Sequence, residues 1–308
     1  MVNTPVLFET FARPEYARQS FDAIKVAKPK VLYFYSNKAR EDRPDEIRRN
    51  EEVRAFIKEI DWECELHTYF RDEYVDVFTS LWGSLNWFFS CVEEGIILEE
   101  DCVPSLAFFD YCEKLLERYR DNSKIRLISG DNFTPEFNPE GYDYFYSHMT
   151  HIYGWATWRD RWMDLDRSMS QWDEIKKNQF IRYYPHVLER LYYGFIIDQT
   201  FKIKNEEFRS WDTLTIYNMI KNGEVSVVPK YNLVINIGAI GANAIVSNDS
   251  VKKDIRYLDN FYSVDTFPSQ IEPFDTYDYK HFKKHVLGNF LKYELKKYWK
   301  LFFNRKRK

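Results

Sequence analysis

The chain has 308 residues, 44% hydrophobic and 19% aromatic, with a net charge of −4; this composition excludes a disordered chain and suits one large α/β domain, alone or with an appendage. Its four cysteines show neither C-x-x-C spacing nor a histidine cluster, which argues against a zinc site and a disulfide framework. No apolar run approaches the roughly 20 residues that cross a bilayer, and no signal-peptide pattern opens the chain, so we expect a cytoplasmic protein.

The first hundred residues alternate between apolar runs and amphipathic stretches, a pattern typical of βαβ units and a mostly parallel sheet. No glycine-rich phosphate loop follows any of these runs, which argues against a nicotinamide enzyme and a P-loop ATPase. We expect strands at Val6–Phe8, Lys30–Ser36, Trp62–Phe70 and Ile96–Leu98, and helices at Pro14–Ala27, Pro44–Ile60 and Phe78–Val92.

The second half of the chain continues the α/β pattern less regularly. Pro104 suits the first turn of a helix that reaches Arg120. No assignment is made for Ser247–Tyr279. Further expectations are a strand at Ile125–Phe133, a helical stretch to about Asn205, a turn at Ser210, a helix ending at Asn222-Gly223, and a strand at Val225–Val228.

The final segment differs from the body in charge. Lys280–Lys308 carries 11 Lys or Arg and one Glu, a balance of +10, which leaves −14 for the rest of the chain (−4 − 10). Its cations interleave with apolar and aromatic residues, which predicts a basic amphipathic helix. Such helices bind anionic membranes, so we expect peripheral attachment to the inner face of the cell membrane and no nucleic acid. The alternative is a helix packed against the acidic body.

An acidic triplet marks the centre of the predicted sheet. Glu99, Glu100 and Asp101 follow directly after the apolar run Ile96–Leu98. Ligands of open α/β sheets bind where the strands end, and carboxylate oxygens are good ligands for hard divalent cations. The triplet therefore predicts a metal site at this edge, with a solvated acidic turn as the alternative.

The segment EEGIILEEDCVPS resembles the metal-binding segment of GT-A glycosyltransferases, specifically bacterial sugar-nucleotide transferases of the inverting N-acetylglucosaminyltransferase I type. The resemblance runs from about Pro5 to about Gly241. It implies a GT-A, Rossmann-like sheet flanked by helices over residues 1–245, with a nucleotide-sugar part (1–133) and an acceptor part (134–245). Residues 246–308 would form a C-terminal helical extension.

The resemblance also implies roles for residues at the ends of the first strands. Asp101 would bind a divalent metal, Mn or Mg, while Glu99 and Glu100 hold ribose or water around it. Phe11, Arg13 and Asn37 fall where the family binds the nucleoside. Arg13 has the alternative of an ordinary surface cation.

A second set of residues resembles the acceptor side of the family. Gly154 and Trp155, in YGWATWRDRW, match the Gly-Trp-Ala-x-Trp segment beside the acceptor. Trp211-Asp212 matches the pair that opens the catalytic helix, which makes Asp212 the expected general base. The alternative for Asp212 is a helix N-cap. Lesser candidates for the base are Asp198 and Asp131.

The function implied is a metal-dependent inverting glycosyltransferase of hexosyltransferase type. It would move a sugar from a nucleotide-sugar donor, expected to be a UDP-sugar, to a glycan or lipid-linked acceptor in surface polysaccharide synthesis. The sequence departs from the family at Glu73–Phe78, which is acidic and aromatic and lacks a glycine turn. This departure favours the alternative of a catalytically silent module that binds nucleotide-sugar or glycan. A nucleotidyltransferase would need a glycine-rich N-terminal loop, which is missing.

Overall fold

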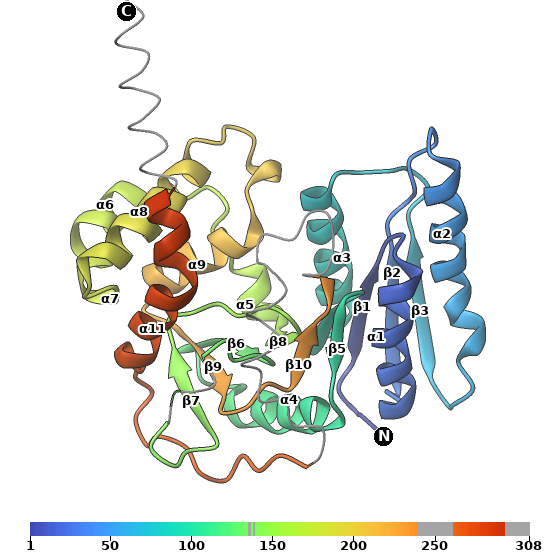
Figure 1. The fold of residues 1–308 in the computed structure, drawn as a ribbon, viewed down its shortest axis with the longest axis horizontal. Coiled ribbons are helices and arrows are strands. Elements are labelled where there is room, and N and C mark those ends of the chain that lie inside the picture. The colour runs from blue at the N-terminus through green and yellow to red at the C-terminus, as the bar shows by residue number, and fades with distance from the viewer. Residues whose placement is uncertain (135–136, 138, 239–260, 293–308) are drawn as a thin grey trace, which may run out of the picture.

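In the computed structural model, residues 1–134, 137, 139–238 and 261–292 are described (Figure 1). The strands are β1 (Val6–Thr10), β2 (Val31–Ser36), β3 (Glu65–Phe70), β4 (Glu94–Glu99), β5 (Cys102–Pro104), β6 (Ile125–Ser129), β7 (Tyr144–Ser147), β8 (Trp155–Trp158), β9 (Val225–Pro229) and β10 (Val234–Asn236). Eight of them form one sheet in the order β3-β2-β1-β4-β8-β6-β9-β7, and β10 pairs with β5.

The large sheet is mixed but mostly parallel. β1 pairs in parallel with β2 and β4, β2 with β3, and β6 with β9. β8 runs antiparallel to both β4 and β6, and β7 runs antiparallel to β9. Six strands therefore end at one edge of the sheet, where β8 and β7 begin. The prediction of an α/β fold with a mostly parallel sheet is confirmed.

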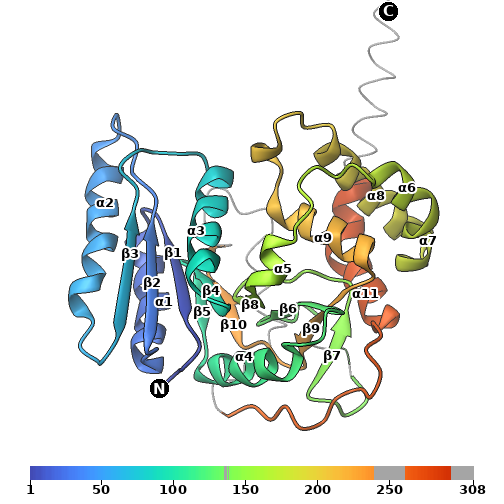
Figure 2. The same cartoon turned by 180° about the vertical axis from the view of Figure 1, so that it is seen from behind.

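Helices cover both faces of the sheet because side chains alternate between the faces along each strand. Phe8 points toward α1, α2 and α4, while Leu7 points toward α3 and the helices of the C-terminal half. Figures 1 and 2 show α1 and α2 at one end of the molecule and α6–α8 at the other. The helices are α1 (Pro14–Ala27), α2 (Pro44–Arg54), η1 (Ala55–Glu59), α3 (Val77–Cys91), α4 (Leu106–Tyr119), α5 (Arg159–Met163), α6 (Trp172–Asn178), α7 (Phe180–Tyr183), α8 (Val187–Phe201), η2 (Glu206–Phe208), α9 (Trp211–Asn222), α11 (Asp275–His281) and η4 (Phe282–Val286).

Several expectations for the second half were wrong. Pro104 ends β5 rather than opening a helix; α4 begins after Ser105, whose hydroxyl accepts a hydrogen bond from the backbone N–H of Phe108 at 3.2 Å. The strand expected to reach Phe133 ends at Ser129. The single helical stretch expected before Asn205 is four helices, α5 to α8. The short strands β5, β7, β8 and β10 were not expected.

The segment that precedes the C-terminus packs on the body in its described part. Phe282, in the π-type turn η4, is fully buried, and Phe290 lies 5.5 Å from Tyr192 and 6.4 Å from Phe195 between ring centroids. Phe282 is therefore unavailable to the membrane surface that the expected amphipathic helix would bind. Residues 293–308, the rest of the expected amphipathic helix, lie outside the described residues. No helix in the described ranges has the length and apolarity that crossing a bilayer demands.

Candidate functional site

A cavity of about 760 Å³ opens at the edge where β1, β2 and β4 end. Arg13, Pro44 and Val77 line it, and these residues stand at the starts of α1, α2 and α3. Each helix follows a parallel strand, so its N-terminus and the positive end of its dipole lie at this edge. The cavity therefore occupies the position where open α/β sheets bind their ligands.

Among the aromatic rings that line this cavity, two lie close together. Phe11 follows β1, and Tyr74 belongs to the loop before α3; their ring centroids lie 6.2 Å apart. The guanidinium of Arg40 lies 5.4 Å from the centroid of Tyr74. The loop also has a capped end, because the Asp76 carboxylate accepts hydrogen bonds from the backbone N–H groups of Phe78 and Thr79. The acidic and aromatic loop, where the sequence departs from the family, therefore forms a wall of the cavity. It contributes the ring of Tyr74 to the lining.

Arg13 balances part of the negative charge of the acidic triplet. Arg13 donates to Glu100 at 2.6 Å through Nε and to Asp101 at 3.0 Å through an Nη nitrogen. Glu100 also accepts the backbone N–H of Phe11 at 2.8 Å. Burial lowers the pKa of Arg13, but the charges of Glu100 and Asp101 outweigh burial and hold it above its usual range. Arg13 is thus an ion-pair partner of the triplet rather than an ordinary surface cation.

Glu99 and Glu9 form a second acidic pair that faces the cavity. They are paired in register on the parallel strands β4 and β1, and both line the cavity. Burial, followed by the charges of Asp101 and Glu9, raises the pKa of Glu99 well above its usual value. Burial also raises the pKa of Glu9 to about 7, although the hydroxyl of Ser84 donates to it. Sequence reasoning missed Glu9, although an acid inside the apolar run VLFET was a signal.

The acidity of Glu9 should appear in the pH dependence of stability. A carboxyl whose folded pKa is raised stabilises the fold below its unfolded pKa, and this contribution is lost as pH rises through the folded pKa. Between pH 4.5 and 7 the wild type should therefore lose about 2–3 kcal/mol of unfolding free energy more than Glu9→Gln does. Urea unfolding at each pH measures the difference.

The control for Glu9→Gln is Glu63→Gln, which removes an exposed carboxyl from the loop before β3. Its stability should follow the wild-type pH curve. A Glu9→Gln curve parallel to that of the wild type from pH 4.5 to 7 would show that Glu9 is ionised in the folded protein.

Asn37 lies at the end of β2 and lines the cavity, but its side chain is used by the fold. Its amide nitrogen donates to the carbonyl of Val75 at 2.9 Å, and its amide oxygen accepts the backbone N–H of Lys38 at 2.9 Å. These bonds fix the loop that carries Tyr74. Asn37 can therefore shape the cavity wall, while a ligand contact through its side chain would compete with these bonds.

The residues expected at the acceptor side come together at the start of β8. Gly154 has a φ of +72°, and a Cβ there would lie 2.6 Å from Val234 Cγ2, so only glycine fits. Trp155 pairs with Ile97 on β4, two residues before Glu99, and stacks on Trp211 with centroids 5.1 Å apart. Trp155 and Trp211 together place the start of α9 beside the acidic end of β4.

Asp212 is the second residue of α9, and the N-cap position belongs to Ser210, so the N-cap alternative for Asp212 is wrong. Its Oδ1 accepts hydrogen bonds from the hydroxyl of Ser210 and from the backbone N–H of Thr213. No described residue donates to Oδ2. The side chain is partly exposed at a helix N-terminus, a position where the helix dipole stabilises a carboxylate.

The two lesser candidates for the base differ in their surroundings. Asp198 accepts the indole N–H of Trp172 at 2.7 Å and pairs with Lys176, so its carboxylate holds α6 to α8. Asp131 follows β6 at the same edge of the sheet as Asp101 and is 1% exposed. Its Oδ2 has no hydrogen-bond partner, and burial raises its pKa to about 8. Asp131 is therefore the better placed of the two for proton transfer.

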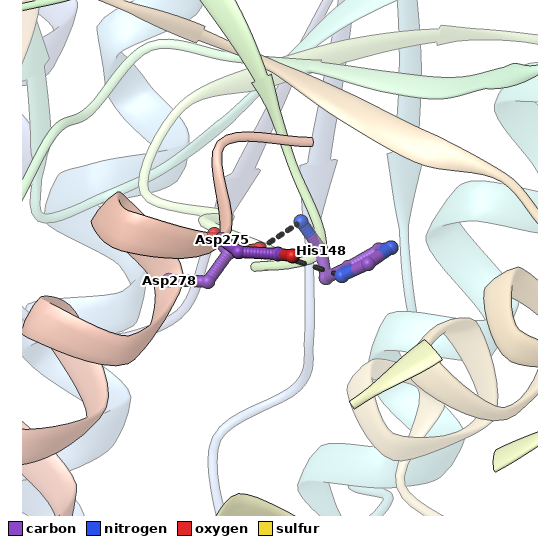
Figure 3. Close-up of side chains that lie close together, drawn as sticks. All are labelled: His148, Asp275 and Asp278. Atoms are coloured by element: carbon purple, nitrogen blue, oxygen red, sulfur yellow. Dashed lines mark hydrogen bonds and ion pairs between the residues drawn. The ribbon is translucent and has the colours of Figure 1, made fainter. Parts of the chain in front are cut away.

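The group of potential metal ligands with the closest spacing lies outside the cavity. Within the described ranges, one group brings three potential ligand atoms within 4.8 Å of one another, and it consists of His148, Asp275 and Asp278 (Figure 3). The triplet does not form such a group. A metal at Asp101 would rely on that carboxylate together with ligands from a bound substrate.

Comparisons with known proteins show partial overlap of folds. No family model and no curated protein match the sequence. HddC from Yersinia pseudotuberculosis overlaps with 41% of this chain, at 9% identity and a TM-score of 0.28. Mannosyltransferase PcManGT from Pyrobaculum calidifontis, in complex with GDP-Man and Mn2+, overlaps with 71% of this chain and 70% of its own length, at 13% identity and a TM-score of 0.36. The glycosyltransferase GlyE in Streptococcus pneumoniae TIGR4 overlaps with 71% of this chain, at 13% identity and a TM-score of 0.32.

The overlap also covers only part of the length of the similar structures. The chain spans 57% of the HddC chain and 43% of the GlyE chain. The similar structures thus include two glycosyltransferases at low identity, and the likeness concerns the path of the chain alone.

Proposed function

We propose that this chain is a metal-dependent inverting glycosyltransferase that moves a sugar from a UDP-sugar to a hydroxyl of a glycan or lipid-linked acceptor. The observation that carries the proposal is the composition of the cavity at the end of β1, β2 and β4. It combines an aromatic ring pair, three helix N-termini and a carboxylate cluster within about 760 Å³. A nucleotide-sugar presents a flat base, a diphosphate and sugar hydroxyls, and each has a matching feature there.

The nucleoside would bind between the ring pair and the helix starts. Phe11 and Tyr74 offer faces on which uracil can stack, in the manner of base–aromatic contacts in other nucleotide sites. The N-termini of α1, α2 and α3 favour an anion, so the diphosphate would lie toward them. Glu9 and Glu99 would then accept hydrogen bonds from ribose or sugar hydroxyls, which relieves the desolvation that raises the pKa of both groups.

The donor set at the end of β4 fits a hard divalent cation. Asp101 is a buried residue that supplies a carboxylate, and its negative charge adds to burial in raising the pKa of Glu99. No described residue donates a hydrogen bond to the Glu99 carboxylate. Asp101 would hold Mn or Mg, and the ion would stabilise the charge that develops on the leaving diphosphate.

The acceptor would approach from the side of β8 and α9. Trp155 and Trp211 stack together and hold the first turn of α9 against the sheet. Asp212 in that turn has one oxygen bound to Ser210 and Thr213, which fixes the direction of the other. Asp212 would take the proton from the acceptor hydroxyl as the oxygen attacks the anomeric carbon, and the bond to the diphosphate breaks on the opposite side.

One contact favours the second candidate, a catalytically silent module that binds nucleotide-sugar. Arg13 donates to Asp101 at 3.0 Å, so a cation of the chain already stands where a metal would bind. In such a module Arg13 would meet the diphosphate directly and no metal would be needed. Release of free sugar from the donor by the pure protein separates the two candidates, since a silent module releases none.

The test of the proposal is a panel of UDP-, GDP-, dTDP- and CMP-sugars in a thermal-shift assay, with and without Mn²⁺. A donor at 100 times its Kd stabilises the fold by about 2.7 kcal/mol, which corresponds to a rise of about 5 °C in Tm. We expect this rise for a UDP-sugar with Mn²⁺, and its loss in Tyr74→Ala. Free UDP-sugar that leaves Tm unchanged at millimolar concentration, with and without Mn²⁺, would contradict the proposal.

We also propose that the C-terminal segment attracts the protein to anionic lipid, where a lipid-linked acceptor would be found. Residues 293–308 carry seven Lys or Arg and the single acid Glu294, and each cation near such a surface contributes about 1 kcal/mol. A chain shortened after Lys292 should float with anionic liposomes several-fold less than the full chain in 0.1 M salt. Equal flotation of the two chains would exclude this role.

A further inference from the structure

The group of His148, Asp275 and Asp278 lies far from the cavity. His148 follows β7, the edge strand at the other end of the sheet from β3, and both carboxylates come from α11. β7 is antiparallel to β9, with Ser147 opposite Ser226, so His148 lies at the edge where the parallel strands start. With β4, β8, β6 and β9 between them, β1 and β7 are about 24 Å apart across the sheet.

The geometry of His148 and Asp278 suits a shared ion. Nδ1 of His148 lies 3.4 Å from Oδ2 of Asp278, which is long for a hydrogen bond (Figure 3). Two ligands at about 2.1 Å from a tetrahedral ion stand about 3.4 Å apart. Asp278 is held in place because the backbone N–H of His148 donates to it at 2.9 Å and the hydroxyl of Ser147 donates to its other oxygen.

A further buried carboxyl lies near the same group. Glu189, in the first turn of α8, is 1% exposed, and its Oε1 has no hydrogen-bond partner. Burial, followed by the charges of Asp278 and Asp275, raises the pKa of Glu189, so Glu189 adds to the uncompensated acidity around the group. An unpartnered carboxyl oxygen in a protein interior costs free energy unless a cation or a donor meets it.

We propose that His148, Asp275 and Asp278 form a binding site for a divalent transition ion, Zn²⁺ or Mn²⁺. One imidazole and two carboxylates are a donor set that such ions accept, whereas Mg²⁺ and Ca²⁺ favour oxygen ligands alone. The site joins the end of β7 to the first turn of α11. The ion clamps α11, which carries the buried Tyr277, onto the edge strand of the sheet. It is a structural ion that needs no nucleotide.

The first experiment is calorimetry and thermal shift on the full chain, stripped with EDTA, with ZnCl₂ or MnCl₂ alone and no nucleotide. We expect one saturable site and a rise of about 5 °C in Tm at 100 times the Kd. MgCl₂ should give a shift at least several-fold smaller at the same concentration. A stripped chain whose Tm does not respond to either transition ion would overturn the proposal.

One variant tests a ligand without relying on a destabilised fold. Asp275→Asn changes an exposed side chain. Without metal, it should melt at or above the wild-type Tm, since it removes the charge of Asp275 that acts on Asp278. With Zn²⁺, it should lose the rise in Tm and at least tenfold in affinity.

The controls separate this site from the nucleotide cavity. Glu272→Gln removes an exposed acid three residues before Asp275 and should keep the full metal response. Asp101→Asn should also keep it, because the ion here binds without a nucleotide. Wild-type affinity for Zn²⁺ in Asp275→Asn would overturn the assignment, whatever the outcome for sugar transfer.

Discussion

Asp101→Asn is expected to weaken Mn²⁺-dependent binding of UDP by about 100-fold or more while the protein stays folded. The substitution removes the negative charge that would hold the ion, and a factor of 100 corresponds to about 2.8 kcal/mol. Asparagine keeps the shape of the side chain, which matters because a Cβ on Gly238 would lie 1.9 Å from Asp101 Oδ2 and the backbone there packs on the carboxylate. Calorimetry of UDP binding with and without Mn²⁺ measures the change.

Two comparisons make the result for Asp101 specific. Asp110→Asn alters a partly exposed acid on α4 that pairs with Lys114, and UDP binding should not change. Binding of UDP without metal should stay the same or become tighter in Asp101→Asn, because Arg13 is released from one partner. Unchanged metal-dependent binding would mean that Asp101 is an ion-pair partner of Arg13 and no metal ligand.

Asp212→Asn is expected to lower turnover of sugar transfer by about 10²–10⁴-fold, the usual contribution of a positioned acid–base group. The amide oxygen can still accept from the hydroxyl of Ser210 and the backbone N–H of Thr213, so the first turn of α9 stays in place. The amide cannot take a proton from the acceptor. Initial rates at saturating donor, with donor Kd and Tm measured in parallel, give the result, and we expect the last two to change little.

The control for Asp212 is Asp198→Asn. Asp198 holds Trp172 and Lys176, so its loss should reduce stability by about 1–3 kcal/mol and leave turnover near the wild-type level. If Asp212→Asn transfers sugar at the wild-type rate, the base lies elsewhere. Asp131 is then the next residue to change, because its unpartnered oxygen stands at the same edge of the sheet.

The elements that sequence reasoning placed well are those whose pattern is local. β1, β2 and β4 are buried apolar runs, and α1 and α2 each begin at a proline, Pro14 and Pro44, as the sequence predicted. The short antiparallel strands β7 and β8 read YFYS and WATW, where every residue is buried and no polar alternation marks a strand. Such runs take their structure from the neighbouring strands rather than from their own sequence.

In the candidate site, too, sequence reasoning placed residues that are neighbours in the chain and missed contacts between distant residues. Glu99, Glu100 and Asp101 were predicted at the end of a central strand, and they lie there. Their compensation by Arg13 was not predicted, since Arg13 is 87 and 88 residues from the acids it meets. Glu9 was missed because its significance depends on Glu99, which the parallel register of β1 and β4 brings beside it.

The sequence alone determined the α/β class, the position of the acidic triplet and the charge of the C-terminal segment, because strand burial, helix starts and net charge depend on neighbouring residues. Only the tertiary structure decided which charges meet. It brought Arg13 to Glu100, Trp211 to Trp155, and His148 to two acids about 130 residues away. The free energy of a buried charge depends on what stands within a few ångströms of it, and that is fixed by strand order and packing rather than by spacing along the chain.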